Sequence, residues 1–176
     1  MVTVGFDLDG FLYDWHSVVQ GYYKKFKGID LPLDKFWTEF IPGLDKQEQD
    51  YIISVPLFYY GISMHPAAVQ FLDWADKNFT VFYVTSRPED CLRVTEKYLR
   101  DHRFPQYENL IFSSDKQSVA RLYKMQYFVD DFIKHVEPLS KVTTAILYAK
   151  PWNREAWDKY PTAHSYNEVR RFMESQ

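Results

Sequence analysis

Short apolar segments of strand length alternate with amphipathic helical patterns along most of this 176-residue chain. The expected strands cover residues 2–6, 80–84, 110–112, 127–129 and 142–148. The expected helices cover residues 66–79, 89–102, 117–124 and 166–173. Strands that are apolar on both faces and separated by helices form a parallel sheet with helices on both sides. The alternation therefore predicts an α/β fold with a doubly wound, mostly parallel sheet.

Residues 15–64 interrupt this alternation, because no segment among them has a clear strand period. A helical pattern opens the region, and an aromatic stretch punctuated by prolines follows it. A mostly helical insertion here could cover the end of the first strand, exclude water and contact a substrate. We expect a core domain of residues 1–14 and 65–176 and a helical cap of residues 15–64. The alternative is an ordinary helical subdomain whose rings only pack against each other.

Two carboxylates, Asp7 and Asp9, stand one residue apart at the end of the first expected strand. Such close negative charges repel each other unless a cation offsets them. Open α/β sheets also bind their ligands beyond the carboxyl ends of the strands. However, Asp9-Gly10 between apolar residues is a strong hairpin signal as well. These residues alone leave both a cation site and a hairpin open.

The ends of three further expected strands carry polar residues that suit the same site. They are Thr85, Ser86, Lys116, Asp130 and Asp131. Ser86 and Ser114 also fit the N-cap positions of the helices that follow them. A lysine in the first turn of a helix is disfavoured by the helix dipole by about 0.3–1 kcal/mol, so Lys116 indicates a negative partner nearby, although a surface lysine would also tolerate so small a cost.

Two acidic pairs that face one crevice imply a bound divalent cation. The chain has no paired-histidine motif and a single cysteine, so carboxylate oxygens favour a hard ion such as Mg²⁺. A magnesium ion beside a lysine, hydroxyls and helix amides suits a phosphoryl group. The sequence lacks the GxxxxGK[ST] loop of nucleotide triphosphatases. We therefore expect phosphoryl transfer through a carboxylate nucleophile.

The formal net charge of −3 and the pI near 5.9 argue against a general nucleic-acid-binding protein. Residues 22–27 interleave three lysines with three aromatic rings, as surfaces that bind single strands do. Because Val18, Tyr22 and Phe26 recur at helical spacing, a helix with this apolar face and a solvated lysine face is the simpler explanation.

Cys91 is the single cysteine, which excludes a disulfide framework and fits a reducing compartment. The N-terminus enters a strand directly, without the features of a signal peptide. No apolar run has the length of a membrane span. We therefore expect a cytoplasmic protein without a membrane partner.

Four motifs, taken in order, resemble those of the haloacid dehalogenase superfamily of phosphohydrolases. They are Asp7-Leu8-Asp9-Gly10, Thr85-Ser86, Lys116 and Asp130-Asp131. The resemblance implies a Rossmann-like core and a magnesium-dependent phosphomonoesterase. It makes Asp7 the nucleophile that forms an aspartyl phosphate and Asp9 the general acid and base. The remaining roles it implies are phosphate binding by Thr85, Ser86 and Lys116, and metal binding by Asp7, the Asp9 backbone carbonyl and Asp131 with support from Asp130.

A narrower likeness adds further segments. Phe36-Trp37, Pro42-Gly43-Leu44, Phe58-Tyr59, the Ser-Asp-Lys that ends at Lys116 and the final Val-Asp-Asp resemble the 5'(3')-deoxyribonucleotidases. This resemblance implies a small helical cap with Trp15, Phe36 and Trp37 around the nucleobase of a nucleoside monophosphate. The chain departs from the family at Ile52, where those enzymes place a further pocket tryptophan.

Other functions fit part of the pattern. A polynucleotide 3'-phosphatase, supported locally by the lysines of residues 22–27, or a small sugar-phosphate phosphatase would keep the same chemistry. A phospho-accepting signalling domain of the receiver type also gathers acidic residues, a hydroxyl and a lysine at strand ends. In this chain the second acidic pair follows the hydroxyl motif, and residues 15–64 have no place in a receiver, so both features argue against that class.

Overall fold

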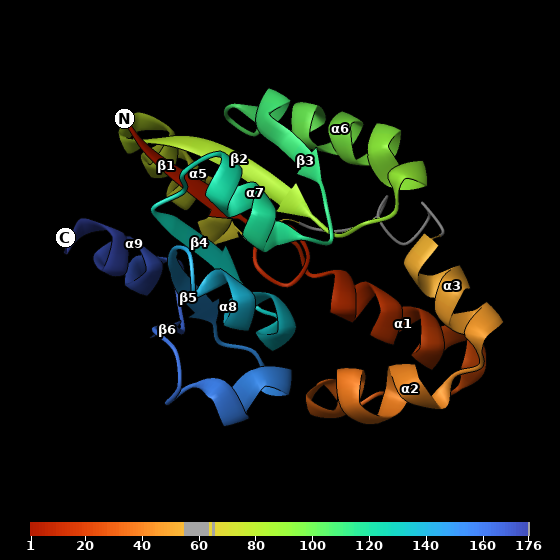
Figure 1. Ribbon diagram of the computed structural model, residues 1–176. Coiled ribbons are helices and arrows are strands. Elements are labelled where there is room, and N and C mark those ends of the chain that lie inside the picture. The colour runs from red at the N-terminus through yellow and green to blue at the C-terminus, as the bar shows by residue number, and fades with distance from the viewer. Residues whose placement is uncertain (55–63, 65, 176) are drawn as a thin grey trace.

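The computed structural model describes residues 1–54, 64 and 66–175 (Figure 1). Its centre is a six-stranded sheet in which every pairing is parallel. The strands are β1 (Val2–Phe6), β2 (Phe79–Thr85), β3 (Leu110–Phe112), β4 (Tyr127–Asp130), β5 (Thr144–Tyr148) and β6 (Thr162–Ala163). Their order is β3-β2-β1-β4-β5-β6, so the winding direction reverses at β1. The α/β class is confirmed, and the sheet is entirely parallel.

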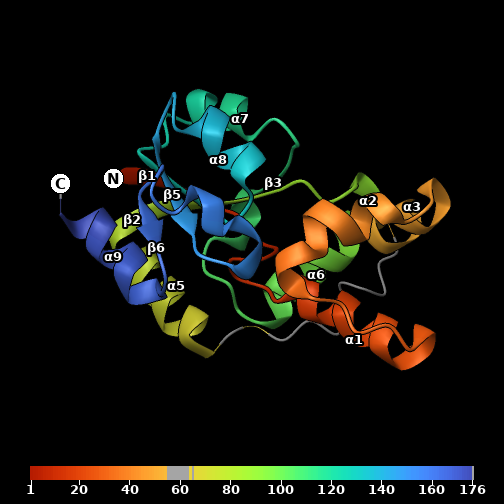
Figure 2. The same ribbon diagram turned by 90° about the horizontal axis from the view of Figure 1, so that it is seen from below.

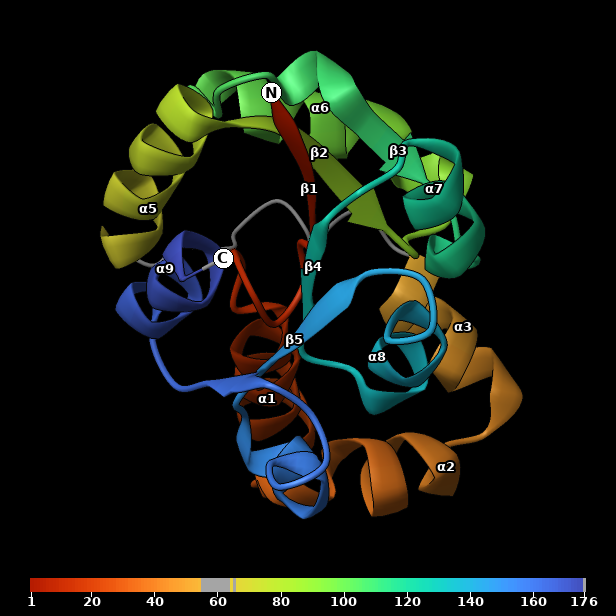
Figure 3. The same ribbon diagram turned by 60° about the vertical axis from the view of Figure 1, so that its left-hand side comes forward.

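Helices cover both faces of the sheet, as a doubly wound fold requires. They are α5 (Pro66–Asn78), α6 (Leu92–Asp101), α7 (Lys116–Leu122), α8 (Ile133–Leu139) and α9 (Tyr166–Glu174), with shorter turns η3 (Glu89–Cys91), η4 (Tyr107–Asn109) and η5 (Pro151–Ala156). Figure 3 shows α5 and α9 on one side of the sheet and α7 and α8 on the other. Two separate apolar clusters result, one with side chains of α5, α6 and α9 and the other with side chains of α7 and α8.

The region between β1 and α5 is helical in its described part. It contains α1 (Trp15–Lys27), η1 (Leu33–Lys35), η2 (Phe36–Phe40), α2 (Ile41–Gly43) and α3 (Lys46–Ser54). Figure 2 shows α1, α2 and α3 grouped together at one end of the molecule, away from α5 and α9. We call residues 15–54 the helical insertion. Phe58 and Tyr59, which belong to the narrower resemblance, lie outside the described residues.

The expected apolar face of the first inserted helix is wrong by one residue. The side chains that α1 buries are Trp15, His16, Val19 and Tyr23. Phe26 is 64% exposed, whereas Val18 and Tyr22 are only partly buried. The helix turns Trp15 and Val19 inward because they join the main apolar cluster, and the aromatic spacing alone did not reveal this.

Two expected helix starts are also corrected. Pro88, and not Ser86, precedes η3, and α6 begins only at Leu92. Asp115, and not Ser114, caps α7, since its carboxylate accepts a hydrogen bond from the Ser118 amide at 3.0 Å.

No hairpin forms at Asp9-Gly10. After β1 the chain makes a tight turn in which the Gly10 amide donates to the Tyr13 carbonyl at 2.8 Å, and the chain then enters α1. The short elements α8 and β6 were not predicted; α8 is a seven-residue helix with Pro138 inside it. None of the helices in the described part of the chain combines the length and apolar character that crossing a membrane requires.

Candidate active site

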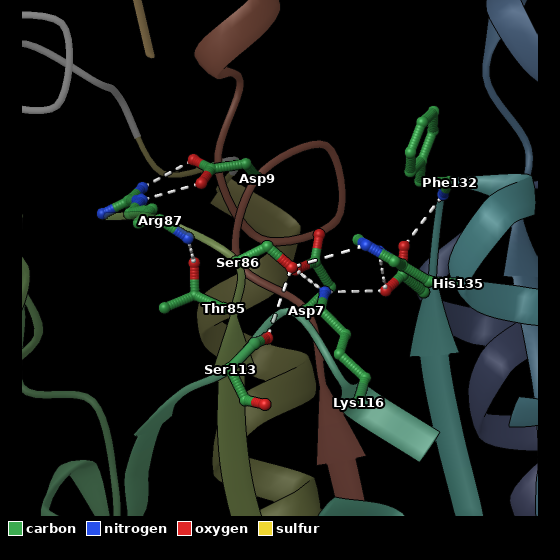
Figure 4. Close-up of polar contacts among 10 residues, drawn as sticks. Asp7, Asp9, Thr85, Ser86, Arg87, Ser113, Lys116, Phe132 and His135 are labelled. Atoms are coloured by element: carbon green, nitrogen blue, oxygen red, sulfur yellow. Dashed lines mark hydrogen bonds and ion pairs between the residues drawn. The ribbon is translucent and has the colours of Figure 1, made fainter. Parts of the chain in front are cut away.

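The carboxyl edge of the sheet gathers most of the residues that the sequence singled out. Asp7 follows β1, Thr85 ends β2, Lys116 opens α7 after β3, and Asp130 ends β4. All four are buried, and so is Asp131. Because all strands are parallel, their carboxyl ends meet at one edge, and Figure 4 shows the resulting cluster of polar side chains.

Lys116 joins two of the buried carboxylates. Its ammonium forms an ion pair with Asp7 and another with Asp130, the latter at 2.7 Å from Nζ to Oδ2. Burial alone would lower the pKa of Lys116, but Asp130 and Asp7 outweigh it and hold that pKa above its ordinary value. The lysine is therefore a fixed positive charge inside the site. Asp7 and Asp130 are the negative partners that its unfavourable position in the first turn of a helix indicated.

Asp130 is the most firmly held of the three buried carboxylates. Its Oδ1 accepts a hydrogen bond from the Phe132 amide at 2.8 Å, and its Oδ2 lies 3.1 Å from Nδ1 of His135. Burial alone would raise the pKa of Asp130, but Lys116 and His135 outweigh it and hold that pKa well below its usual range. Asp130 is thus a permanent anion that anchors Lys116.

Asp7, Asp130 and Asp131 form a potential metal site. One carboxylate oxygen from each lies within 4.8 Å of the others. Burial, and then the neighbouring Asp130, raises the pKa of Asp131 to about 7, and burial raises the pKa of Asp7 well above its usual range. Three buried carboxylates beside one lysine leave an excess of negative charge, which a cation would offset. The all-oxygen donor set fits a hard divalent ion.

Neighbouring residues fix the position of Asp131. The indole Nε1 of Trp152 donates to its Oδ2 at 2.8 Å, and Asn153 donates to its backbone carbonyl at 2.8 Å. Gly10 has a φ of +92°, and a Cβ atom at that position would stand 2.3 Å from Asp131 Oδ2. Only glycine leaves room for the carboxylate here.

Asp9 has a different cation. Its carboxylate receives two hydrogen bonds from Arg87, from Nε at 2.7 Å and from Nη2 at 2.5 Å. Figure 4 shows Asp9 and Arg87 on one side of the site, with Lys116 and His135 on the other. Asp7 and Asp9, which are one residue apart in the sequence, are therefore paired with different cations, Lys116 and Arg87.

The two predicted hydroxyl residues differ in exposure. Thr85 is buried, and its Oγ1 accepts a hydrogen bond from the Arg87 amide at 3.2 Å. Ser86 is exposed, and its Oγ donates to the Ser113 carbonyl at 3.3 Å and lies 3.4 Å from Nε2 of His135. Both residues line the same pocket as Asp7.

A pocket of about 220 Å³ connects the carboxylates with the helical insertion. Its lining residues are Asp7, Asp9, Trp15, His16, Trp37, Ile53, Thr85, Ser86, Arg87, Asp131, Phe132 and His135. Trp15 and Trp37 lie nearly parallel, at 19° and 6.2 Å between ring centroids. The pocket therefore has a charged end at the sheet and an aromatic end at the insertion.

Some predicted pocket residues lie behind this lining. Phe36 is fully buried against Trp15 and Trp37 and is not among the lining residues. Ile52, at the position of the departure from the nucleotidase pattern, is also fully buried, and its neighbour Ile53 faces the pocket instead. Lys116 and Asp130 also lie outside the lining, behind Asp7. Lys116 forms ion pairs with both Asp7 and Asp130.

Sequence reasoning missed several residues of the site, among them His16, Ile53, Arg87, Phe132, His135 and Trp152. Arg87 follows the Thr85-Ser86 motif directly, so a cation at a strand end next to a predicted phosphate-binding pair was a signal that could have been used. His16 carries no such signal, because its role depends on burial between the Trp37 and Trp152 rings.

Comparison with known proteins gives one similar curated sequence and many similar folds. No protein-family model matches the sequence. A Bacillus cereus protein named "Putative nucleotidase" is 26% identical over 141 residues, which cover 72% of this chain and 75% of that protein. A haloacid dehalogenase-like family hydrolase from Streptococcus pneumoniae superposes with a TM-score of 0.67 at 15% identity over 99% of both chains.

A hydrolase of the same group from Deinococcus radiodurans, solved with bound phosphate and sodium, superposes with a TM-score of 0.65 at 16% identity. The matched region covers 98% of this chain and 95% of that protein. The chain has the fold of the haloacid dehalogenase-like hydrolases, as the resemblance of its four sequence motifs predicted.

Proposed function

We propose that this protein is a magnesium-dependent phosphomonoesterase that works through an aspartyl-phosphate intermediate. The observation that carries the proposal is the buried arrangement of Asp7, Asp130 and Asp131 within 4.8 Å of one another, with Lys116 paired to the first two. A site with three carboxylates, one lysine and a predicted cation can hold a phosphoryl group beside a carboxylate nucleophile. The fold shared with the haloacid dehalogenase-like hydrolases supports the same reaction class.

The chemistry divides hydrolysis into two steps. In the first, an Asp7 carboxylate oxygen attacks phosphorus, the bond from phosphorus to the ester oxygen breaks, and Asp9 gives its proton to the leaving alcohol. In the second, Asp9 takes a proton from water as the water oxygen attacks phosphorus, which releases inorganic phosphate and restores Asp7. Thr85 and Ser86, which line the pocket, would hold the phosphoryl oxygens, and Lys116, behind Asp7, would offset their negative charge.

Asp7, Asp131 and the Asp9 backbone carbonyl would bind Mg²⁺, with Asp130 in support. Bound there, the ion supplies positive charge that offsets the phosphoryl oxygens. The fit rests on the all-carboxylate donor set and on the space that Gly10 leaves for Asp131.

For the substrate we propose a nucleoside monophosphate, with residues 15–64 acting as a cap over the site. The aromatic end of the pocket, formed by Trp15 and Trp37, suits a planar base. The relative named as a nucleotidase supports the same class. A polynucleotide substrate is less favoured. Lys24 and Lys27 of the lysine cluster in residues 22–27, which supported it, form ion pairs with Asp30 and Glu48.

A substrate panel tests the proposal. Initial rates with Mg²⁺ on dUMP, dTMP, a 3'-phosphorylated oligonucleotide and small sugar phosphates should be highest for a mononucleotide. The Asp7→Asn variant should remain folded and lose turnover by at least about a thousandfold, since the nucleophile is removed. Near-native magnesium-dependent activity in Asp7→Asn would contradict the mechanism. A stable stoichiometric phosphoprotein without turnover would instead favour the signalling class.

A further inference from the structure

Arg87 binds the Asp9 carboxylate through two parallel hydrogen bonds. Nε donates to Oδ2 at 2.7 Å and Nη2 donates to Oδ1 at 2.5 Å, so each carboxylate oxygen has its own N–H donor. This fork geometry fixes both the position and the plane of a carboxylate, which a lysine ammonium cannot do. The two residues are 78 positions apart in the sequence and meet only in the folded chain.

The guanidinium is itself held from behind. Nη1 of Arg87 donates to Oγ1 of Thr95 in α6 at 3.0 Å. The group also lies over the ring of Tyr13, at 5.1 Å from its centroid, and that ring packs edge-on against Tyr98 of α6. With a side chain only 3% exposed, Arg87 is part of a rigid support that extends from α6 to the pocket.

Direct binding of a substrate phosphate by Arg87 is disfavoured by these contacts. Each of its three guanidinium nitrogens already donates a hydrogen bond, two of them to Asp9 and one to Thr95. The other two of its five N–H groups belong to a side chain that is only 3% exposed, so a phosphoryl group has little access to them. The Asp9 side chain, in contrast, is 20% exposed and lines the pocket beside Asp7.

We propose that Arg87 is a positioning residue for Asp9: its fork holds this carboxylate at the pocket wall where the alcohol leaves. The inference rests on the function proposed above. Arginine stays protonated and cannot transfer the proton itself. It occupies one lone-pair site on each Asp9 oxygen, so the carboxylate keeps further sites for the transferred proton.

The experiment compares Arg87→Lys and Arg87→Ala with the wild type on a nucleoside monophosphate and on p-nitrophenyl phosphate. Both variants should lower kcat for the nucleotide by about 10- to 100-fold and change KM little, because orientation of the acid is lost and binding is not. The first step, measured as release of the leaving group in a single turnover, should be slowed much less for p-nitrophenyl phosphate, whose leaving group departs without protonation. The second step uses Asp9 as a base with both substrates and should be slowed equally. Added guanidinium, below denaturing concentration, should restore part of the Arg87→Ala activity, and methylammonium should not.

Two further variants provide the controls. Arg170→Lys makes the same substitution in an exposed ion pair of α9, with Glu174, and should leave kcat and KM unchanged. Thr95→Val removes the rear partner of the guanidinium at similar volume and should lower kcat a few-fold. If Arg87→Ala fails to fold, as judged by thermal unfolding, Arg87→Lys and Thr95→Val still give the comparison.

The outcomes separate the two proposals. A raised KM with unchanged kcat in Arg87→Lys would make Arg87 a substrate-binding group and overturn the inference. Equal losses of the first-step rate for both substrates, without guanidinium rescue, would also overturn it. An active wild type with inactive Asp7→Asn and normal Arg87→Lys would refute only the role of Arg87, whereas a wild type inactive on every substrate would refute the proposed function and the inference together.

Discussion

The two ends of the pocket are built by different physical rules. At the sheet end, buried charges are matched one against another: Lys116 with Asp7 and Asp130, and Arg87 with Asp9. At the end formed by the helical insertion, rings pack on rings, with His16 enclosed by Trp37 and Trp152. The sheet end is therefore sensitive to the loss of a single charge, because an uncompensated buried ion is costly. The insertion end should tolerate substitution better and should affect substrate affinity more than chemistry.

The largest effect on stability is expected from Lys116→Met. Removal of this buried cation leaves three carboxylates without their internal positive charge, which should destabilise the metal-free protein by about 3–5 kcal/mol. Lys25→Met, at an exposed position of α1, should stay within about 0.5 kcal/mol of the wild type. Urea unfolding in the presence of a chelator measures both variants, and equal losses would contradict the cost assigned to an uncompensated buried charge at the sheet end.

Gly10→Ala should have the next largest effect. The new Cβ would stand 2.3 Å from Asp131 Oδ2 at a residue with a φ of +92°, so backbone strain alone should cost about 1–3 kcal/mol. Displacement of Asp131 should also weaken Mg²⁺ binding, measured by calorimetry. Gly21→Ala is the matched control, because the position is open and helical and the change should stabilise by up to about 1 kcal/mol. Unchanged Mg²⁺ affinity in Gly10→Ala would argue against a metal role for Asp131.

His16 should make stability depend on pH. Burial, and then nearby Lys150, lowers the pKa of His16 to about 3, so the unfolded chain binds a proton between pH 3 and 6.5 that the folded chain does not. Its contribution to stability is complete above pH 6.5 and should fall by about 2 kcal/mol between pH 7 and pH 5.

The matching measurement is the difference in unfolding free energy between wild type and His16→Phe at pH 7 and at pH 5. In the metal-free protein Asp131 has the opposite effect. Because its pKa is raised to about 7, its contribution to the free energy of unfolding is lost as the pH rises. Because both proteins contain Asp131, its contribution cancels in the difference. A pH-independent difference would contradict the buried neutral state of His16.

The smallest effect is expected from Trp37→Ala. Loss of this ring from the pocket should raise KM for a nucleoside monophosphate by about tenfold, with kcat changed little, because stacking on one ring contributes about 1–3 kcal/mol. Phe26→Ala removes a ring of α1 that is 64% exposed and outside the pocket lining, and it should leave both constants unchanged. A fall in kcat without a change in KM would show that the aromatic end of the pocket contributes to catalysis and not to substrate binding.

The degree to which the sequence predicted the site follows from how each part is built. Asp7, Lys116, Asp130 and Asp131 could be placed together in advance, because each follows an apolar strand and parallel strands end at the same edge. The face that α1 buries could not be placed, since Tyr22 and Phe26 have the same spacing as Val19 and Tyr23. In α1, contacts with other parts of the chain decided which stripe faced inward.

The sequence by itself determined that two closely spaced carboxylates, a hydroxyl pair, a lysine and a second acidic pair stand at strand ends, because strand length and apolar periodicity are local properties of the chain. Only the tertiary structure decided which cation forms an ion pair with which carboxylate. Lys116 reaches Asp7 and Asp130, whereas Arg87, braced by Thr95 and Tyr13, reaches Asp9. An ion pair depends on side-chain rotamers and on the packing of distant segments, and neither is encoded in the spacing of residues along the chain.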